Sequence, residues 1–195
     1  MKKDINKYKK AFTLVEILVS IAIFSLLIAG PTGFFISSIK GQKKALSSQE
    51  LIDNASYFLE YFSRAVRMAQ KAKDTGCLSF SNLNYELIAG PGIKFVNYKG
   101  ECQEIFLFLD EQTKTYRIKE IRKALDGIPK EGFLTASNLE VSSFQVKLSG
   151  ETQGDNLQPK VTVLLKMKGT SQSEEMNPEI SIQTTLSQRN LDIEE

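Results

Sequence analysis

The feature that most constrains this chain is a long apolar segment near its N-terminus that contains a single carboxylate. Between Phe12 and Ile39 the only charged residue is Glu16. As a helix, the twenty mostly apolar residues 17–36 would be about 30 Å long, which is the thickness of the hydrocarbon core of a bilayer. The sequence therefore predicts a membrane-spanning helix.

Basic residues cluster in front of this segment. Residues 1–10 carry five lysines against one acid, Asp4, and three more lysines follow between positions 40 and 44. Cytoplasmic flanks of membrane helices are enriched in Lys and Arg. The bias therefore predicts a cytoplasmic N-terminus, with the rest of the chain on the other side of the membrane.

Three kinds of N-terminal segment begin in this way. A conventional secretory signal needs a small-residue cleavage site, and the one at 28–30 is followed by Pro31, a poor residue at a scissile amide. An uncleaved anchor would more naturally have an apolar residue at Glu16, because an acid in the middle of a bilayer costs about 3 kcal/mol. The third kind is cut in front of its apolar part.

The residues around Glu16 support this third interpretation. Residues 9–18 read KKAFTLVEIL and resemble the prepilin signal of the type IV pilin superfamily. In that family a short basic leader ends in a small residue, usually Gly. The mature chain begins with Phe, has Glu as its fifth residue and continues as an apolar helix. The resemblance extends over residues 9–28 and places the cleavage between Ala11 and Phe12, with Ala11 departing from the usual Gly.

The resemblance implies partners and a role for each motif residue. A prepilin peptidase would remove the leader and N-methylate Phe12, and an inner-membrane assembly platform would bring the mature chain to other pilin or pseudopilin subunits. A buried charge is tolerable only when it is paired. The Glu16 carboxylate would therefore pair with the Phe12 amine of a neighbouring subunit and register the assembly, while residues 14–35 supply the packing.

A second helical pattern follows the apolar segment. Pro31, with Gly30 and Gly33, predicts a weak point or a kink. Beyond it, apolar residues recur at three and four positions, which predicts an amphipathic helix with one buried face. They are Ala55, Phe58, Leu59, Phe62, Val66 and Ala69. The pattern predicts that the helix ends near Lys73, before a turn at 74–76.

From Leu78 onward, short β-like runs alternate with turn signals. Residues 161–167 alternate between two faces, whereas residues 105–109 are continuously apolar, which predicts a central strand covered on both faces. The six predicted strands are 93–98, 104–109, 115–121, 141–148, 161–167 and 180–186.

One long helix followed by a meandering antiparallel sheet is an α+β layout. It is also the layout for which pilin-like proteins are known. The predicted divisions are a cytoplasmic leader 1–11, a transmembrane or filament-core helix half 12–36, an amphipathic helix half 37–73, and a β-rich globular head 74–195 packed on residues 50–73.

The two cysteines, Cys77 and Cys102, both follow the apolar segment and share one compartment. Outside the cytoplasm, a disulfide between them would close a loop of about 26 residues and stabilise the fold by about 3 kcal/mol. The alternative is two buried free thiols. Their spacing fits no zinc pair and the chain has no histidine, so no metal site is predicted.

Little in the sequence points to catalysis. The absence of histidine removes the commonest general base near neutral pH. The adjacent Asp110 and Glu111 would point apart in a strand and are better explained as the start of a turn into Thr113. Polar loops at 155–156 and 174–175 offer oxygen ligands without a calcium-loop pattern. We therefore predict a protein that is not an enzyme and has no cofactor.

Charge limits the partners of the body. Removal of residues 1–11 takes away five bases and one acid, so the formal net charge falls from +2 to −2. Nucleic-acid binding needs a clustered positive surface, so it is not expected of the body itself.

The resemblance implies a structural subunit of a type IV pilus, a type II secretion pseudopilus or a related DNA-uptake filament. It would reside in the inner membrane and then in the filament. Residues 183–190 are similar to the closing strand of minor pilins and J-type secretion pseudopilins, which favours a minor subunit. The alternative is a single-pass membrane-anchored binding module, an adhesin or a DNA-uptake receptor. An exposed aromatic and basic surface on the sheet would favour that alternative.

Overall fold

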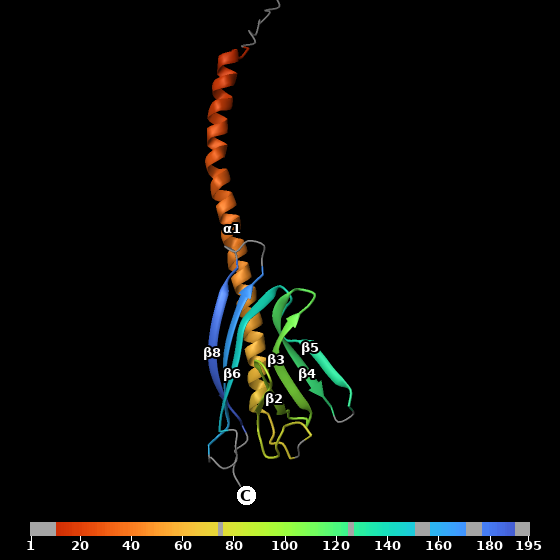
Figure 1. Ribbon diagram of the computed structural model, residues 1–195. Helices are drawn as coiled ribbons and strands as arrows, with labels where there is room; N and C mark the ends of the chain where they lie inside the picture. Colours follow the sequence, from red (N-terminus) through yellow and green to blue (C-terminus); the bar gives the residue numbers. More distant parts are fainter. Residues whose placement is uncertain (1–10, 74–75, 125–126, 151–156, 171–176, 190–195) are drawn as a thin grey trace, which may run out of the picture. The chain divides into compact units, whose positions relative to one another are not determined.

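The computed structural model describes residues 11–73, 76–124, 127–150, 157–170 and 177–189. Within these residues one long helix, α1 (Leu14–Arg67), precedes eight strands, and every pairing between these strands is antiparallel (Figure 1). The chain divides into two compact units, residues 1–43 and 44–195. The first unit holds the beginning of α1, and the second holds the end of α1 together with the β-rich head.

The strands form two sheets instead of the single meander predicted from the sequence. The five-stranded sheet has the order β1-β2-β3-β4-β5, and the three-stranded sheet has the order β6-β7-β8. The strands are β1 (Glu86–Leu87), β2 (Gly92–Val96), β3 (Cys102–Asp110), β4 (Thr115–Lys123), β5 (Pro129–Phe133), β6 (Leu139–Ser149), β7 (Lys160–Gly169) and β8 (Glu179–Ser187).

All six predicted strands are confirmed, as β2, β3, β4, β6, β7 and β8, and two strands were missed. β1 has only two residues, too few for a pattern. β5 begins at Pro129, which the sequence analysis assigned to a turn. Proline is tolerated at the first residue of an edge strand, where no ladder hydrogen bond is lost. Every residue of β5 is exposed, so the strand has no apolar alternation by which to recognise it.

β3 lies in the middle of its sheet, but the prediction that both its faces are covered was wrong. Gln103 and Ile105 are buried on the face that meets α1, whereas Phe108 on the other face is 37 % exposed. The apolar residues on the outer face pack on one another: the ring of Phe108 lies 6.2 Å from that of Phe106 and 6.3 Å from that of Phe133. Residues 105–109 are therefore continuously apolar because the outer face of β3 is aromatic, and not because both faces are buried.

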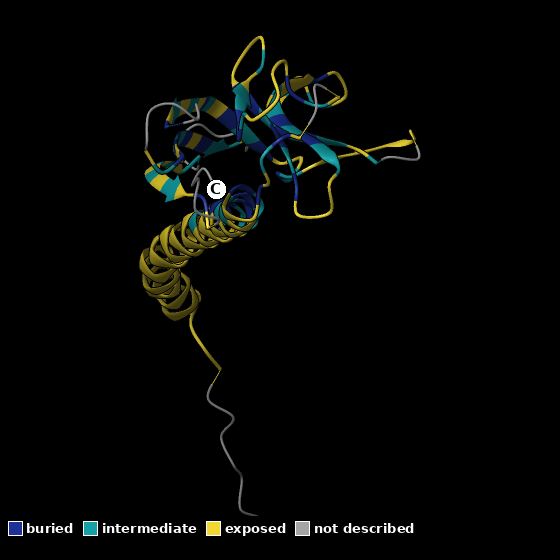
Figure 2. Ribbon diagram, turned by 90° about the horizontal axis from the view of Figure 1, so that it is seen from below, coloured by how far each residue is buried: buried dark blue, intermediate teal, exposed yellow. Residues whose placement is uncertain are grey.

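The hydrophobic core lies where the end of α1 meets both sheets. The buried residues of α1 are Leu51, Ala55, Phe58, Phe62 and Val66, which confirms the predicted apolar face. Phe144 of β6 packs edge-on against Phe58 and Phe62, at centroid distances of 5.9 and 6.1 Å. In Figure 2, α1 is coloured as buried only where it meets the strands.

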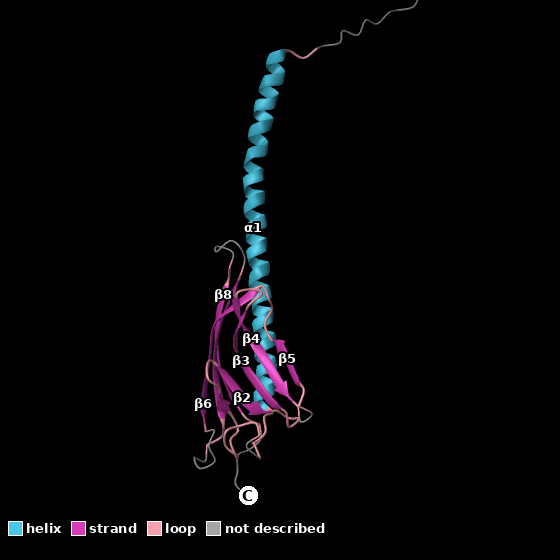
Figure 3. Ribbon diagram, turned by 45° about the vertical axis from the view of Figure 1, so that its right-hand side comes forward, coloured by secondary structure: helices cyan, strands magenta, loops and turns pink. Residues whose placement is uncertain are grey.

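α1 ends at Arg67, several residues before the predicted end near Lys73. In Figure 3 the helix gives way there to a loop. The Gln70 N–H donates to the Val96 carbonyl at 2.9 Å, so the chain leaves the helix to pair with β2. Residues 69–73 consist of good helix formers, and tertiary pairing overrides that local preference.

Distant residues donate to three carbonyls at the C-terminal end of α1 and just beyond it. A helix leaves its last four carbonyls without intrahelical donors. The pairs are Tyr85 Oη to Val66 O at 2.7 Å, Arg189 N to Arg67 O at 2.8 Å, and Gln188 Nε2 to Ala69 O at 2.9 Å. The segment after β8 therefore caps α1, a role that its sequence did not indicate.

We expect Tyr85→Phe to lower the free energy of unfolding by about 1 kcal/mol, because the buried Val66 carbonyl loses its bond from the Tyr85 hydroxyl and keeps only the longer one from the Ala69 N–H, at 3.2 Å, while the ring packing is kept. Burial also raises the pKa of the Tyr85 hydroxyl above its ordinary value of 10.0. A pKa raised by folding gives stability that is complete below the unfolded-state pKa and is lost as pH rises above it. The wild type should therefore lose stability above about pH 10, and the variant should lose less.

Urea unfolding of the two proteins at neutral pH and at strongly alkaline pH measures both effects. Tyr57→Phe is the matched control, because Tyr57 lies on the exposed face of α1. An equal loss of stability in the control at neutral pH would contradict the capping role.

Candidate functional site

The prepilin-type motif lies at the beginning of α1. Ala11, Phe12 and Thr13 precede the helix and are exposed, and α1 starts at Leu14. The peptide bond between Ala11 and Phe12 therefore lies outside the helical segment, in an exposed stretch of the kind that proteases reach. The rest of the predicted leader, residues 1–10, is outside the described residues.

Thr13 and Glu16 cap the helix reciprocally. Thr13 Oγ1 accepts from the Glu16 N–H at 3.3 Å, and Glu16 Oε2 accepts from the Thr13 N–H and from the Thr13 hydroxyl, both at 2.9 Å. This is a capping box, which pairs two backbone donors that a helix start leaves unsatisfied. We did not predict it from the sequence, although the Thr-x-x-Glu spacing is its signal.

The first part of α1 is long and apolar enough to cross a membrane. Three hydroxyl groups in this part donate to the backbone carbonyl four residues earlier: Ser20 to Glu16 at 2.7 Å, Ser25 to Ile21 at 2.8 Å, and Thr32 to Ile28 at 2.8 Å. Polar groups satisfied inside the helix need no water in the bilayer. The Glu16 carboxylate remains the one charged group between residues 12 and 39.

Pro31 lies inside α1, and helical residues continue on both sides of it. The predicted weak point is therefore not a break in the helix. Proline lacks the N–H that would bond to the carbonyl of Leu27, four residues earlier. The helix therefore continues past Pro31 with this backbone hydrogen bond missing.

Cys77 and Cys102 form a disulfide, with their Cα atoms 5.4 Å apart. Cys77 lies in the segment after α1, and Cys102 is the first residue of β3. The bond therefore ties the segment that leaves the helix to the five-stranded sheet. From the sequence alone, free thiols were an open alternative.

We expect the double variant Cys77→Ser with Cys102→Ser to lose about 3 kcal/mol of stability, because the open loop of about 26 residues regains entropy in the unfolded chain. Thermal unfolding of wild type and variant, each with and without reductant, measures the loss. Reductant should destabilise only the wild type. Rapid labelling of both cysteines in the folded, unreduced wild type would contradict the bond.

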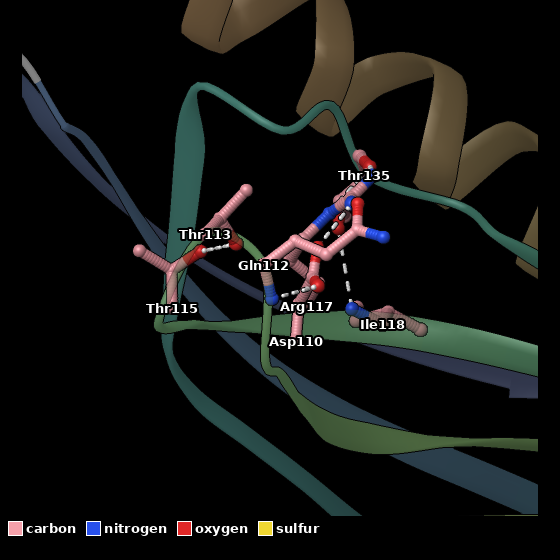
Figure 4. Close-up of polar contacts among 7 residues, drawn as sticks. All are labelled: Asp110, Gln112, Thr113, Thr115, Arg117, Ile118 and Thr135. Atoms are coloured by element: carbon pink, nitrogen blue, oxygen red, sulfur yellow. Dashed lines mark hydrogen bonds and ion pairs between the residues drawn. The ribbon is translucent and has the colours of Figure 1, made fainter.

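Asp110, the last residue of β3, belongs to a structural cluster (Figure 4), whereas Glu111 lies exposed in the turn that follows. Arg117 Nη1 donates to Asp110 Oδ2 at 2.7 Å, and the Gln112 N–H donates to Asp110 Oδ1 at 3.0 Å. These bonds, the one from Arg117 foremost, lower the pKa of the Asp110 carboxyl. Arg117 Nε also donates to the Thr135 carbonyl at 3.2 Å, which joins the predicted turn to the segment after β5. A carboxylate held ionised in this way is suited to structure and not to proton donation.

Among the described residues, no group of three or more His, Cys, Asp or Glu side chains could hold a metal ion. The two loops considered for calcium, 155–156 and 174–175, lie outside the described residues.

Comparison with known proteins matches the N-terminal motif. Residues 6–30 match the family described as "Prokaryotic N-terminal methylation motif". The matched stretch contains the Ala11–Phe12 bond and both residues of the capping box. Comparison with curated proteins and with solved structures gave no match.

Proposed function

We propose that this type IV pilin-like protein is a minor pilin or pseudopilin, a structural subunit of a membrane-rooted filament. The observation that carries the proposal is a prepilin-type motif at the start of a helix whose apolar surface is uncovered. On this helix Leu26 is 76 % exposed and Phe34 is 79 % exposed. Apolar surface of this extent is stable only against lipid or against other chains.

In this proposal a prepilin peptidase cuts between Ala11 and Phe12 and methylates the new amine. The mature chain stays in the inner membrane through the first part of α1, with its head outside the cytoplasm. An assembly platform then moves it into a pilus or pseudopilus, where residues 14–35 exchange lipid for the helices of other subunits. That exchange costs little, because both environments are apolar.

Glu16 registers the subunits. In the single chain its carboxylate is bonded to Thr13, which offers only neutral donors. A carboxylate in an apolar layer needs an opposite charge nearby, and the free Phe12 amine of a neighbouring subunit supplies one. Correct docking pairs the two charges, and docking out of register leaves both unpaired.

One feature of the five-stranded sheet favours the alternative function, a membrane-anchored binding module. Its outer face carries an aromatic ladder with cations over two of the rings: Phe106, Phe108 and Phe133, with Lys119 and Arg117 at 4.8 and 3.9 Å from the ring centroids of Phe108 and Phe133. Both cations are also held in ion pairs with acidic side chains. The surface is therefore more aromatic than basic, and a filament subunit could also display it.

Incorporation into filaments tests the proposal. In cells that make the filament, antibody against the head should find the wild type in the fraction that contains the other subunits, after shearing or after cross-linking. Ala11→Leu should remain in the membrane, because a large residue replaces the small one before the cut, whereas Ala11→Gly should behave as the wild type. A wild-type chain found only in the membrane, beside filaments that contain the other subunits, would favour the anchored binding module.

A further inference from the structure

A basic pocket lies in the second unit, where α1 ends and the chain crosses to the five-stranded sheet. Its volume is about 460 Å³. Its walls come from the segment after α1, from β2, from the start of β3 and from the end of β4. Four of its lining residues are lysines, and no described residue that lines it is acidic: the lysines are Lys71, Lys73, Lys94 and Lys123.

Main-chain pairing and a covalent bond hold the pocket together. The strand register places Val96 beside Cys102, and Cys102 beside Lys123, so three adjacent strands form the floor. The Gln70 N–H bond to the Val96 carbonyl and the disulfide fix the segment that carries Lys73 against this floor. The lysines therefore come from distant parts of the sequence and meet on a rigid frame.

The positive charge of the pocket is local. Residues 12–195 carry a formal net charge of −2, so the cluster does not reflect a basic protein. Lys94 Nζ lies 3.3 Å from Glu104 Oε1, outside the lining. Lys73 and Lys123 are exposed, and the described part of the chain gives neither an ion pair. Several like charges around one hollow create a positive potential that favours an anion.

We propose that this pocket binds a phosphorylated organic molecule of the size of a mononucleotide or a sugar phosphate. Lysine binds phosphate as a compact point charge, so a lining with four lysines suits a phosphate group. The pocket is larger than a lone phosphate ion and lies within the range of small-molecule sites, about 300–1,000 Å³. Val96, Ala124 and the disulfide offer apolar contact to the carbon skeleton. The inference concerns the head and does not depend on cleavage or assembly.

Calorimetric titration of the full chain in micelles of an uncharged detergent, at low salt, tests this site. Adenosine monophosphate should bind saturably and adenosine should not. Lys73→Gln with Lys123→Gln should weaken binding at least about tenfold, because two charge-assisted contacts are lost. The matched control is Lys147→Gln with Lys166→Gln, which removes two exposed lysines of the three-stranded sheet. The control should change binding by less than about twofold, because those charges are remote and screened.

The same titration with glucose 6-phosphate and with glucose shows whether the pocket recognises the phosphate group without the adenine base. Every protein in these titrations keeps the lysines of residues 1–10, so any binding of phosphate to those lysines is the same in all of them. If both double variants bind adenosine monophosphate equally weakly, the loss reflects net charge alone, and the proposed site is wrong. Equal binding of adenosine and adenosine monophosphate, or no saturable binding, would also overturn it. Binding of a short oligonucleotide with neither small phosphate bound would overturn the small-ligand assignment.

Discussion

Glu16→Gln should enter the membrane and be processed like the wild type, yet be lost from the filament fraction. Glutamine can still close the capping box with Thr13, so the start of α1 is preserved. It cannot neutralise the Phe12 amine of a neighbouring subunit. Leaving one partner of a buried ion pair uncompensated costs about 3–5 kcal/mol, which corresponds to more than a hundredfold in each docking equilibrium.

Two companion variants separate the charge from the cap. Glu16→Val removes both and should insert but not assemble. Thr13→Ala removes the hydroxyl cap and keeps the carboxylate, so it should still assemble. The measurement is the ratio of filament to membrane protein for each variant, after mass spectrometry has shown that each is processed. If Glu16→Gln assembles while Thr13→Ala does not, Glu16 acts through the helix cap and the registration role is wrong.

Phe144→Ala should lower the free energy of unfolding by about 3–5 kcal/mol, the range for a truncated buried phenylalanine. Phe144 is in contact with two aromatic residues of α1, so the cavity would open where the helix meets the sheets. Domain stabilities are about 5–15 kcal/mol, so the loss is a large part of the total.

Phe80→Ala is the control, because Phe80 is 70 % exposed, and it should change stability by less than about 0.5 kcal/mol. Urea unfolding followed by circular dichroism measures both variants. A loss below about 1 kcal/mol for Phe144→Ala would show that this ring is not central to the core.

Features with a strong periodic pattern could be predicted from the sequence. The membrane-length segment, the apolar face that includes Phe58 and Phe62, and six of the eight strands in the described part of the chain each follow from residues close together in the sequence. The Thr13 to Glu16 capping box was equally local. Its signal is the Thr-x-x-Glu spacing at the start of the apolar segment.

The remaining features depend on contacts between distant residues. α1 ends at Arg67 because Gln70 pairs with β2, and Gln188 caps a carbonyl 119 residues away in the sequence. β5 is exposed throughout, so no burial pattern marks it. The lysines of the pocket converge only after the strands have paired. No local pattern contains this information, because tertiary contacts decide it.

We propose that this chain is a prepilin cut in front of Phe12. Intact-mass spectrometry after co-expression with a prepilin peptidase tests it most directly. Ala11→Leu provides the uncut reference. The wild type should lose residues 1–11 and begin at a Phe12 that carries a single methyl group. A chain that keeps residues 1–11 in the presence of an active peptidase would contradict the claim.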